Sequence, residues 1–390
     1  MIIGMIKKIK YGLGLIKTSY NKPAHIKAIL NDIFKSENKS YSNKEHLKSA
    51  MEWLCRAQDV TGCGGVSGGY YLYKGWGQPY PETTGYIIPT FISYAKLIKD
   101  DNYIKRAISM GDWEIKIQLP SGAVRGEMGI NDSPAVFDTG QVIFGWLSLY
   151  NETRQNRFMD AAIKAGDWLM SVQDKDGKWS KHIYQNTLHT YNTRVAWSLM
   201  ELYNVTNNKR YKTAAEKNIL WAMDQARENG WFNHMSFSDN HPPHTHTIAY
   251  TLRGLLESSF YLSGETKQKV VNIVKKASEN MVAKYESREY LPATLNENWE
   301  SKDTYSCLTG NVQISIILLT LVKHRLINNG IKFLNVAQNL IDQVKIRQSV
   351  DSKHLGIEGA IPGSYPIWGG YMPFAYPNWA AKFFADAIML

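Results

Sequence analysis

The stretch RFMDAAIKAGDWLMSVQDKDGKW, residues 157–179, decides the fold of this chain. Its apolar residues recur at three- and four-residue spacing, as an amphipathic helix requires, and small residues occupy one face. Trp168 is followed five residues later by Gln173, and Gly177 comes four residues after that. We expect the glycine to end the helix, because glycine tolerates a left-handed backbone. The stretch therefore predicts one amphipathic helix followed by a turn.

The same order of Trp, Gln and Gly recurs elsewhere in the chain. Two further copies keep the spacing and a third is looser: Trp53–Gln58–Gly62, Trp113–Gln118–Gly122 and Trp221–Gln225–Gly230. A repeat of this length indicates a helical unit that cannot bury its apolar face alone and must stack on its neighbours.

Six more apolar segments alternate with these copies, and each begins at a Thr or Asn. The six positions lie 53 to 69 residues apart: Thr84, Thr139, Asn192, Thr245, Thr309 and Asn378. Such residues cap helix N-termini by accepting backbone N–H bonds, so a helix should start within a residue or two of each. Helices that are apolar nearly all round need six amphipathic helices to cover them. We predict an all-α fold, an (α/α)6 toroid of six helical hairpins over residues 44–390, with all six starts at one rim.

The charge of the chain bears on its partners. The 390 residues carry a net charge of +10, with a pI near 9.2. This balance favours anionic partners, such as acidic polysaccharides or anionic lipid. Nucleic acid is not expected, because zinc-finger and aromatic RNA-binding motifs and long Arg/Lys blocks are absent from the sequence. The cysteines, Cys55, Cys63 and Cys307, lack CxxC spacing and indicate thiols in a reducing, cytoplasmic compartment.

Residues 1–43 read as a basic helical extension. Lys7, Lys8, Lys10 and Lys17 interrupt its apolar runs, so neither a signal peptide nor a transmembrane helix is predicted. The segment is either a solvated basic helix or a peripheral contact with the inner face of a membrane.

The segment QDKDGKW, residues 173–179, resembles the QxxDGxW repeats of squalene and hopene cyclases. The whole run also resembles the six-hairpin carbohydrate-active enzymes, namely glycoside hydrolases, sugar epimerases and uronate lyases, and toroid proteins of bacterial surface-polysaccharide biosynthesis. The resemblance covers about nine tenths of the chain and implies the toroid architecture. It leaves the reaction open.

The inner helices of such a ring begin around one cavity, and their N-termini project positive partial charge into it. Polar residues two positions after the Thr/Asn column should line this cavity as substrate contacts: Tyr86, Gln141, Arg194 and Asn311. Capping and contacts between hairpins are the alternative explanation for the polar positions in this column.

The segment HTYNTR, residues 189–194, suggests a reaction. His189 or Tyr191 would remove the proton alpha to a sugar carboxylate, while Asn192 and Arg194 neutralise that carboxylate. The set resembles that of toroid uronate lyases by residue type and placement. Alternatively, Asn192 only caps its helix and Arg194 only pairs with a neighbouring acid.

The segment HPPHTHT, residues 241–247, contributes more histidines. His244 and His246 are further catalytic candidates at an inner-helix start. A metal site formed together with His241 is the alternative, but no further ligand stands at a suitable spacing beside them. We therefore predict neither a metal nor another cofactor.

Two carboxylates offer a different chemistry. Glu82 in PETTG and Asp138 in FDTGQ precede adjacent inner helices, and a glycoside hydrolase needs such a pair. The aromatic stretch 363–379 is predicted to be a loop over the bowl or a lid that closes the ring. Its candidate substrate contacts are Tyr365, Trp368, Tyr371, Tyr376 and Asn378.

Four functions follow in order of preference. The first is proton abstraction on a uronic-acid-containing surface glycan or its lipid-linked precursor, by a lyase or C5-epimerase. The second is a glycoside hydrolase that uses Glu82 and Asp138. The third is isoprenoid chemistry, although the DxDD motif of such cyclases is absent from the sequence. The fourth is a glycan-binding ring without catalysis.

Overall fold

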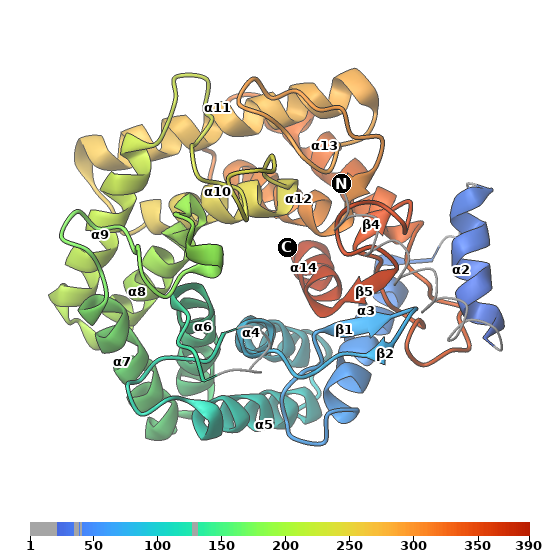
Figure 1. The fold of residues 1–390 in the computed structure, drawn as a ribbon, viewed down its shortest axis with the longest axis horizontal. Coiled ribbons are helices and arrows are strands. Elements are labelled where there is room, and N and C mark those ends of the chain that lie inside the picture. The colour runs from blue at the N-terminus through green and yellow to red at the C-terminus, as the bar shows by residue number, and fades with distance from the viewer. Residues whose placement is uncertain (1–21, 35–38, 40, 127–131) are drawn as a thin grey trace.

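The computed structural model describes residues 22–34, 39, 41–126 and 132–390, and its helices form two concentric rings around one axis (Figure 1). The inner ring consists of α4 (Pro81–Ile98), α6 (Val136–Thr153), α8 (Thr193–Thr206), α10 (Thr245–Ser259), α12 (Leu308–Lys323) and α14 (Asn378–Met389). The outer ring consists of α3 (Asn43–Asp59), α5 (Asn102–Ile117), α7 (Asn156–Ser171), α9 (Lys209–Asp224), α11 (Gly264–Arg288) and α13 (Gly330–Lys345).

The ring closes through the two ends of the chain. Each inner helix contacts the next, and α14 contacts α4 to complete the circle. Five hairpins join an inner helix to the outer helix that follows it in sequence. The sixth pairs the last inner helix, α14, with the first outer helix, α3. The predicted (α/α)6 toroid is confirmed.

Small residues on the outer helices allow close packing on the inner ring, as predicted from residues 157–179. Ala161, Ala162 and Ala165 of α7 are buried. A Cβ atom added to Gly166 would lie 2.3 Å from a methyl carbon of Leu202 in α8, so a larger side chain would push the two helices apart. The core that results runs continuously around the ring.

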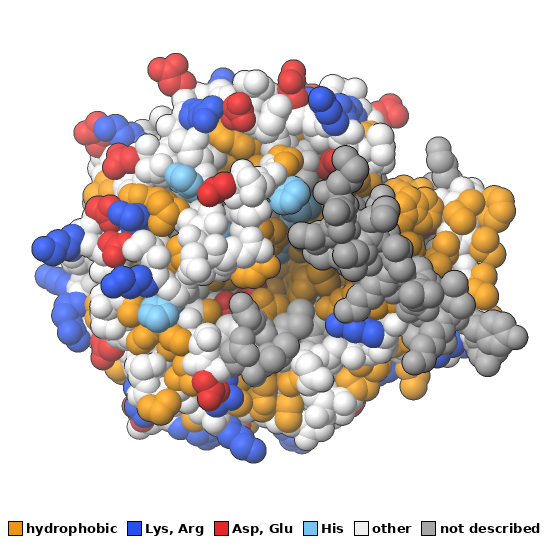
Figure 2. Space-filling view, viewed as in Figure 1, with side chains coloured by type: hydrophobic (Ala, Val, Ile, Leu, Met, Phe, Trp, Pro, Cys, Tyr) orange, Lys and Arg blue, Asp and Glu red, His pale blue; other side chains and the backbone are white. Residues whose placement is uncertain are grey.

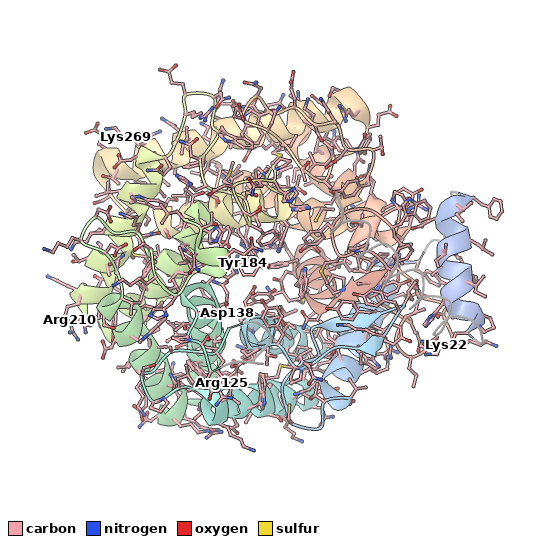
Figure 3. All side chains as sticks on the ribbon, in the orientation of Figure 1. Lys22, Arg125, Asp138, Tyr184, Arg210 and Lys269 are labelled. Atoms are coloured by element: carbon pink, nitrogen blue, oxygen red, sulfur yellow. The ribbon has the colours of Figure 1, made fainter. Side chains whose placement is uncertain are left out.

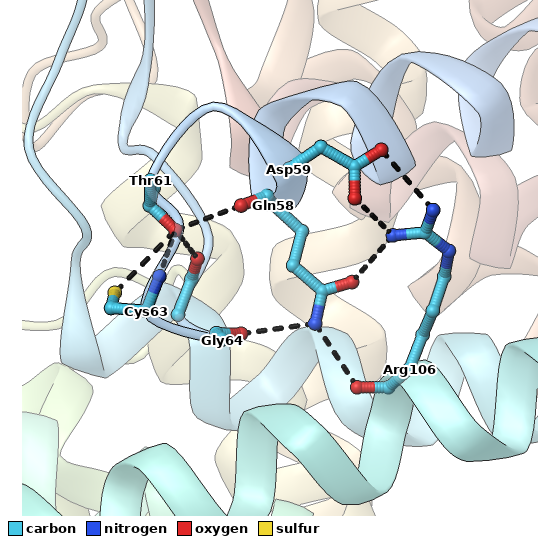
Figure 4. A network of polar contacts seen from close by, with 7 residues as sticks. Gln58, Asp59, Thr61, Cys63, Gly64 and Arg106 are labelled. Carbon is cyan, nitrogen blue, oxygen red and sulfur yellow. Dashed lines mark hydrogen bonds and ion pairs between the residues drawn. The ribbon is translucent and has the colours of Figure 1, made fainter.

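The repeated glutamine clamps consecutive outer helices together. Gln58 Nε2 donates hydrogen bonds to the carbonyl oxygens of Gly64 at 3.0 Å and of Arg106 in α5 at 3.1 Å (Figure 4). Gln118 and Gln173 repeat the pattern, each bonding a carbonyl of its own turn and one of the next outer helix. The conserved spacing within the chain therefore satisfies buried backbone carbonyls between hairpins.

The looser fourth copy lacks this clamp. Gln225 Nε2 donates within its own helix, to the Trp221 carbonyl at 3.4 Å. Asn280 of the long helix α11 takes over instead and donates to the Asn229 carbonyl at 2.9 Å. The irregular spacing seen in the sequence thus corresponds to a different contact.

The glycine of the repeat has a role other than the predicted helix cap. Gly122 and Gly177 have φ of +94° and +92°, but they follow the last helical residue by several positions. A Cβ atom at Gly122 would lie 2.4 Å from the Lys164 carbonyl oxygen. Glycine is required because the turn combines a positive φ with close approach to the next outer helix.

The predicted capping role of the Thr/Asn column is wrong. Helices α4 and α6 begin three residues before Thr84 and Thr139, one residue outside the predicted window. The hydroxyl of Thr84 instead accepts a bond from the Val66 N–H, and that of Thr139 from the Val124 N–H, each at 2.9 Å. These threonines attach the preceding loop to the inner helix. The other four positions of the column lie within one residue of a helix start: Asn192, Thr245, Thr309 and Asn378.

Short strands tie the loops of the rim together. Strand β1 (Gly69–Tyr71) lies between β2 (Gly75–Trp76) and β5 (Ala375–Pro377), antiparallel to both. Strand β3 (Ser306–Cys307) pairs with β4 (Ser364–Tyr365). The aromatic stretch 363–379 therefore closes the ring by strand pairing, which fits the predicted lid better than a free loop.

The described part of the N-terminal extension includes one helix, α2 (Pro23–Ile33), outside the ring (Figure 1). His25 Nε2 lies 3.0 Å from the Tyr70 hydroxyl, and the Ile367 N–H donates to Asp32. The lysines at positions 7, 8, 10 and 17, on which the membrane-contact hypothesis rests, lie outside the described residues. Among the described helices, none is long and apolar enough to cross a membrane.

Candidate functional site

Two carboxylates occupy the first turns of adjacent inner helices at one rim of the ring. Glu82 belongs to α4 and Asp138 to α6, and these helices pack against each other. A carboxylate in the first helical turn is favoured by the positive end of the helix dipole. Asp138 lies beside the central opening, and so does Tyr184, which belongs to the short helix η2 (Tyr184–Asn186) (Figure 3). Arg210 and Lys269 lie on the outer surface.

Glu82 has the environment of a proton donor. The hydroxyl of Tyr80 donates to Glu82 Oε2 at 2.6 Å, and that of Tyr250 donates to Oε1 at 3.5 Å. Burial nevertheless dominates and raises the pKa of Glu82 to about 7. At neutral pH a large share of Glu82 therefore carries a proton.

The two carboxylates share the same neighbours. Burial, followed by the negative charges of Glu82 and Asp138, raises the pKa of both Tyr80 and Tyr191 well above the ordinary value. Asp138 itself is 8% exposed. The two acids and the two tyrosines thus form one cluster, which we call the rim site together with Tyr250.

Aromatic rings line the rim site. The Phe137 ring centroid lies 5.0 Å from that of Tyr191 and 5.1 Å from that of Tyr250. His246 continues this wall, 4.3 Å from Tyr250 and 5.4 Å from Tyr371. The molecular surface is hollowed near the ring axis, with hydrophobic side chains on the walls (Figure 2). Tyr184 is 49% exposed beside this hollow, so its ring is available to stack on a ligand.

His189 is engaged by the backbone. Its Nδ1 and Nε2 lie 3.0 and 2.9 Å from the carbonyl oxygens of Ser236 and Tyr184, and its ring stacks on Tyr191 at 4.3 Å. Burial lowers its pKa. The neutral ring donates to one of these carbonyls at a time, and a carbonyl oxygen lies against each nitrogen. His189 therefore fixes the loop before η3 (Thr190–Asn192) and packs against the ring of Tyr191.

His244 and His246 are neutral at physiological pH. Burial lowers the pKa of His246 to about 3 and that of His244 to about 4. His246 Nδ1 lies 2.7 Å from Gln313 Oε1. His241 is exposed nearby, but in the described part of the chain no three His, Cys, Asp or Glu side chains are placed to hold a metal ion.

Arg194 lies deeper than the rim site. Its Nε donates to Gln141 Oε1 at 2.8 Å, and its guanidinium lies 4.8 Å from the Tyr250 ring centroid. Its side chain, 2% exposed overall, borders a cavity of 430 Å³ together with Tyr86. Burial lowers the pKa of Arg194 to about 10, so it remains charged at neutral pH. Arg194 therefore lies between the rim and the interior of the ring.

Other predicted contacts fall away from the rim. A separate cavity of 490 Å³ beside α2 is lined by Asn311, Tyr365 and Trp368. Asn311 faces the outer helix α13, and its Nδ2 donates to Gln343 Oε1 at 3.5 Å. Asn378 Nδ2 donates to the Ser67 carbonyl at 2.8 Å and so ties α14 to a loop.

Two further predicted contacts have structural surroundings. Tyr376 is buried in strand β5, opposite Tyr70 of β1. Asn192 is buried immediately before α8 and makes no side-chain cap bond. Their roles as substrate contacts stay predictions.

Sequence reasoning missed several members of the rim site. Tyr80 immediately precedes α4 and stands two residues before Glu82. Phe137 is the second residue of α6 and stands immediately before Asp138. Tyr250 lies one and a half turns into α10, where an aromatic residue reads as core. Only the ring geometry brings it to Glu82. Tyr184 gave a weak signal as an isolated aromatic residue in a polar loop.

Comparisons with known proteins agree with this architecture. Residues 77–260 match the family model of the squalene-hopene cyclase C-terminal domain. No curated protein is significantly similar to the chain. The predicted resemblance to cyclase repeats is thus found in α4 to α10, the part of the chain that contains three of the four Trp–Gln–Gly copies.

Solved structures share the fold at low sequence identity. The unsaturated glucuronyl hydrolase of Bacillus sp. GL1 superposes with a TM-score of 0.70 at 13% identity, over 89% of this chain and 96% of its own. An unsaturated glucuronyl hydrolase mutant from Streptococcus agalactiae, complexed with dGlcA-GalNAc6S, gives 0.66 at 12%, over 93% and 94%. An alpha-amylase from Clostridium perfringens gives 0.63 at 14%, over 90% and 99%. The toroid of carbohydrate-active enzymes is therefore the fold of this chain.

Proposed function

We propose that the chain is a glycoside hydrolase that cleaves an acidic, uronic-acid-containing glycan at the rim site, with residues 44–390 as the catalytic unit. The observation that carries this proposal is the pair of carboxylates, Glu82 and Asp138, at the starts of adjacent inner helices. One of them holds a proton near neutral pH, and both act on the same tyrosines.

Each carboxylate has a distinct part in the proposed reaction. Glu82 gives its proton to the glycosidic oxygen as the bond to the anomeric carbon breaks. The sugar then carries positive charge, which ionised Asp138 stabilises. Water supplies the oxygen that forms the new bond to the anomeric carbon, and its proton returns the acid site to its starting state. These reaction steps require no metal ion.

The structure supports this chemistry better than proton abstraction alpha to a carboxylate. His189 has both nitrogens occupied by backbone carbonyls, and the pKa of Tyr191 is raised well above its ordinary value. Neither is therefore prepared to remove a proton. Arg194 bonds Gln141 and borders the interior cavity, and its charge lowers the pKa of Glu82, so it has a place beside the proposed acid.

An acidic substrate is supported by charge and by fold. The chain has a net charge of +10, and the N-termini of α4 and α6 open towards the rim site. Several proteins of the same fold are named as unsaturated glucuronyl hydrolases, one of them with a bound dGlcA-GalNAc6S. We infer a substrate with a uronic acid at the cleaved position.

The test uses the disaccharide dGlcA-GalNAc6S and a set of glucuronide oligosaccharides, each incubated with the full chain in D2O. A hydrolase should release a reducing sugar from either substrate. The saturated glucuronides separate the reactions, because on them a hydrolase should act without exchanging the C5 proton. A new ultraviolet-absorbing end would instead identify a lyase, and proton exchange without chain cleavage would identify an epimerase. Either result would replace the proposal with proton-abstraction chemistry.

A further inference from the structure

A cavity of 430 Å³ lies behind the rim site, and we call it the rear cavity. It extends from Tyr86 and Arg194 to Ser93, in the C-terminal half of α4, and Asn151, in the last turn of α6. Ser93 and Asn151 are exposed, so this end communicates with solvent. The rear cavity therefore opens at the end of the inner ring opposite Glu82 and Asp138.

Three cationic side chains from three inner helices border the rear cavity. They are Arg194 of α8, Arg253 of α10 and Lys382 of α14. Arg194 is 2% and Lys382 6% exposed. Burial lowers the pKa of Lys382 to about 8; the charge of Asp386 opposes this shift, and the positive charges of Arg253 and Arg194 add to it. The three positive charges thus converge on one space.

The three cations differ in how they are balanced. Lys382 pairs with Asp386, and Arg253 Nε lies 3.3 Å from Glu257 Oε1. Arg194 Nη1, by contrast, is buried and has no hydrogen-bond partner among the described residues. A buried charged donor without a partner is costly, because its desolvation is uncompensated. An anion in the rear cavity would supply the missing acceptor.

The walls of the rear cavity suit an apolar body attached to that anion. Phe144 and Trp197 present ring faces near the guanidinium of Arg194, and Leu147 and Val205 add aliphatic surface. A cavity of this volume is in the usual range for small-molecule sites. We propose that the rear cavity binds a small organic carboxylate, whose oxygens accept bonds from Arg194 and Arg253 while its apolar body rests against Trp197. This site is independent of the proposed hydrolase activity.

Calorimetric titration of the full chain with sodium benzoate tests this site directly, without any assay of turnover. Saturable binding is expected, and it should weaken with added salt. Benzamide, which has nearly the same shape but no charge, should bind at least about tenfold more weakly, since bonds to charged groups carry that much affinity. Absence of saturable benzoate binding, or equal affinity for benzamide, would overturn the proposal.

Two variants locate the binding. Arg253→Gln removes one donor and should weaken benzoate binding about tenfold or more. Its matched control, Arg210→Gln on the outer surface, should leave the affinity unchanged. Ser148→Trp fills the rear cavity from α6 and should abolish binding, whereas Ser287→Trp on the exposed end of α11 should not. Retained affinity in a folded Ser148→Trp protein would place benzoate elsewhere and refute the site. The comparison with benzamide decides the question if that variant does not fold.

Discussion

The rim site and the rear cavity lie at opposite ends of the same inner ring. Burial shifts the pKa of a titratable group at each end, in opposite directions. At the rim it raises the pKa of a carboxyl, Glu82, to about 7, and at the rear it lowers the pKa of an ammonium, Lys382, to about 8. The partners differ. Glu82 is held by tyrosine hydroxyls, whereas Lys382 is paired with the carboxylate of Asp386.

This difference separates two uses of buried charge. At the rim, burial outweighs the tyrosine hydroxyls and the charge of Arg194, which both favour the ionised form of Glu82, so the acid can hold a proton and give it to a bound molecule. At the rear, Arg194 keeps its charge and has a buried donor without a partner among the described residues, which suits it to holding an anion. We therefore expect chemistry at the rim and binding at the rear.

The largest effect should come from the rim carboxylates. Glu82→Gln or Asp138→Asn keeps the shape of the side chain but removes proton transfer or negative charge, so kcat for glycan hydrolysis should fall about 100- to 10,000-fold. Arg253→Gln should leave kcat within about threefold, because Arg253 and its partner Glu257 lie at the rear cavity and not beside the rim carboxylates. Full turnover in Asp138→Asn, together with inactive Arg194→Lys and Tyr191→Phe, would restore proton abstraction.

A smaller effect should follow from the charge of the substrate. An acidic oligosaccharide should show a KM about tenfold below that of its carboxyl-reduced counterpart, as expected for one charge-assisted hydrogen bond. Salt should narrow the gap by screening the helix N-termini. Kinetics on the two substrates at low and high ionic strength measure both effects, and equal KM values would remove the case for a uronate.

Tyr184 should matter for binding and little for the reaction. Tyr184→Ala removes an exposed ring beside the hollow, and KM should rise about threefold to tenfold with kcat nearly unchanged. Trp368→Ala is the matched control, because Trp368 is similarly exposed, at 42%, but lines the cavity beside α2. A larger effect from Trp368→Ala would move the sugar to that cavity.

The smallest effect should appear in the pH profile. As a proton donor, Glu82 is active below its pKa, so activity should be lost as pH rises through about 7. The Tyr80 hydroxyl stabilises the ionised form and thereby lowers the pKa of Glu82. Tyr80→Phe should consequently move the alkaline limb of kcat upward, by less than about one pH unit. Tyr184→Phe should not move it, and a downward shift in Tyr80→Phe would contradict the assignment.

Much of the architecture was readable from the sequence because it depends on local periodicity. The Trp–Gln–Gly spacing located the outer helices α3, α5 and α7, and the apolar segments located the inner ring. The capping role of the Thr/Asn column was misread, because a threonine at a helix start bonds either its own helix or a neighbouring loop. Thr84 and Thr139 bond the loop.

The candidate site was only half readable. Glu82 and Asp138 follow from carboxylates at two helix starts, but Tyr80 and Tyr250 belong to the rim only through three-dimensional packing. Asn311 shows the converse case. It shares its column with Gln141 and Arg194, yet it faces α13 and lines the cavity beside α2.

Local periodicity is enough to show that this chain builds alternating amphipathic and apolar helices, and that such helices must close into a ring. The direction of each polar side chain on an inner helix was decided by the tertiary structure alone. An inner helix is apolar nearly all round, so its periodicity marks no face as the one towards the axis. Packing against two neighbours and one outer helix fixes that rotation. It brings Glu82, Asp138 and Tyr250 together, places Arg194 beneath them and turns Asn311 outward.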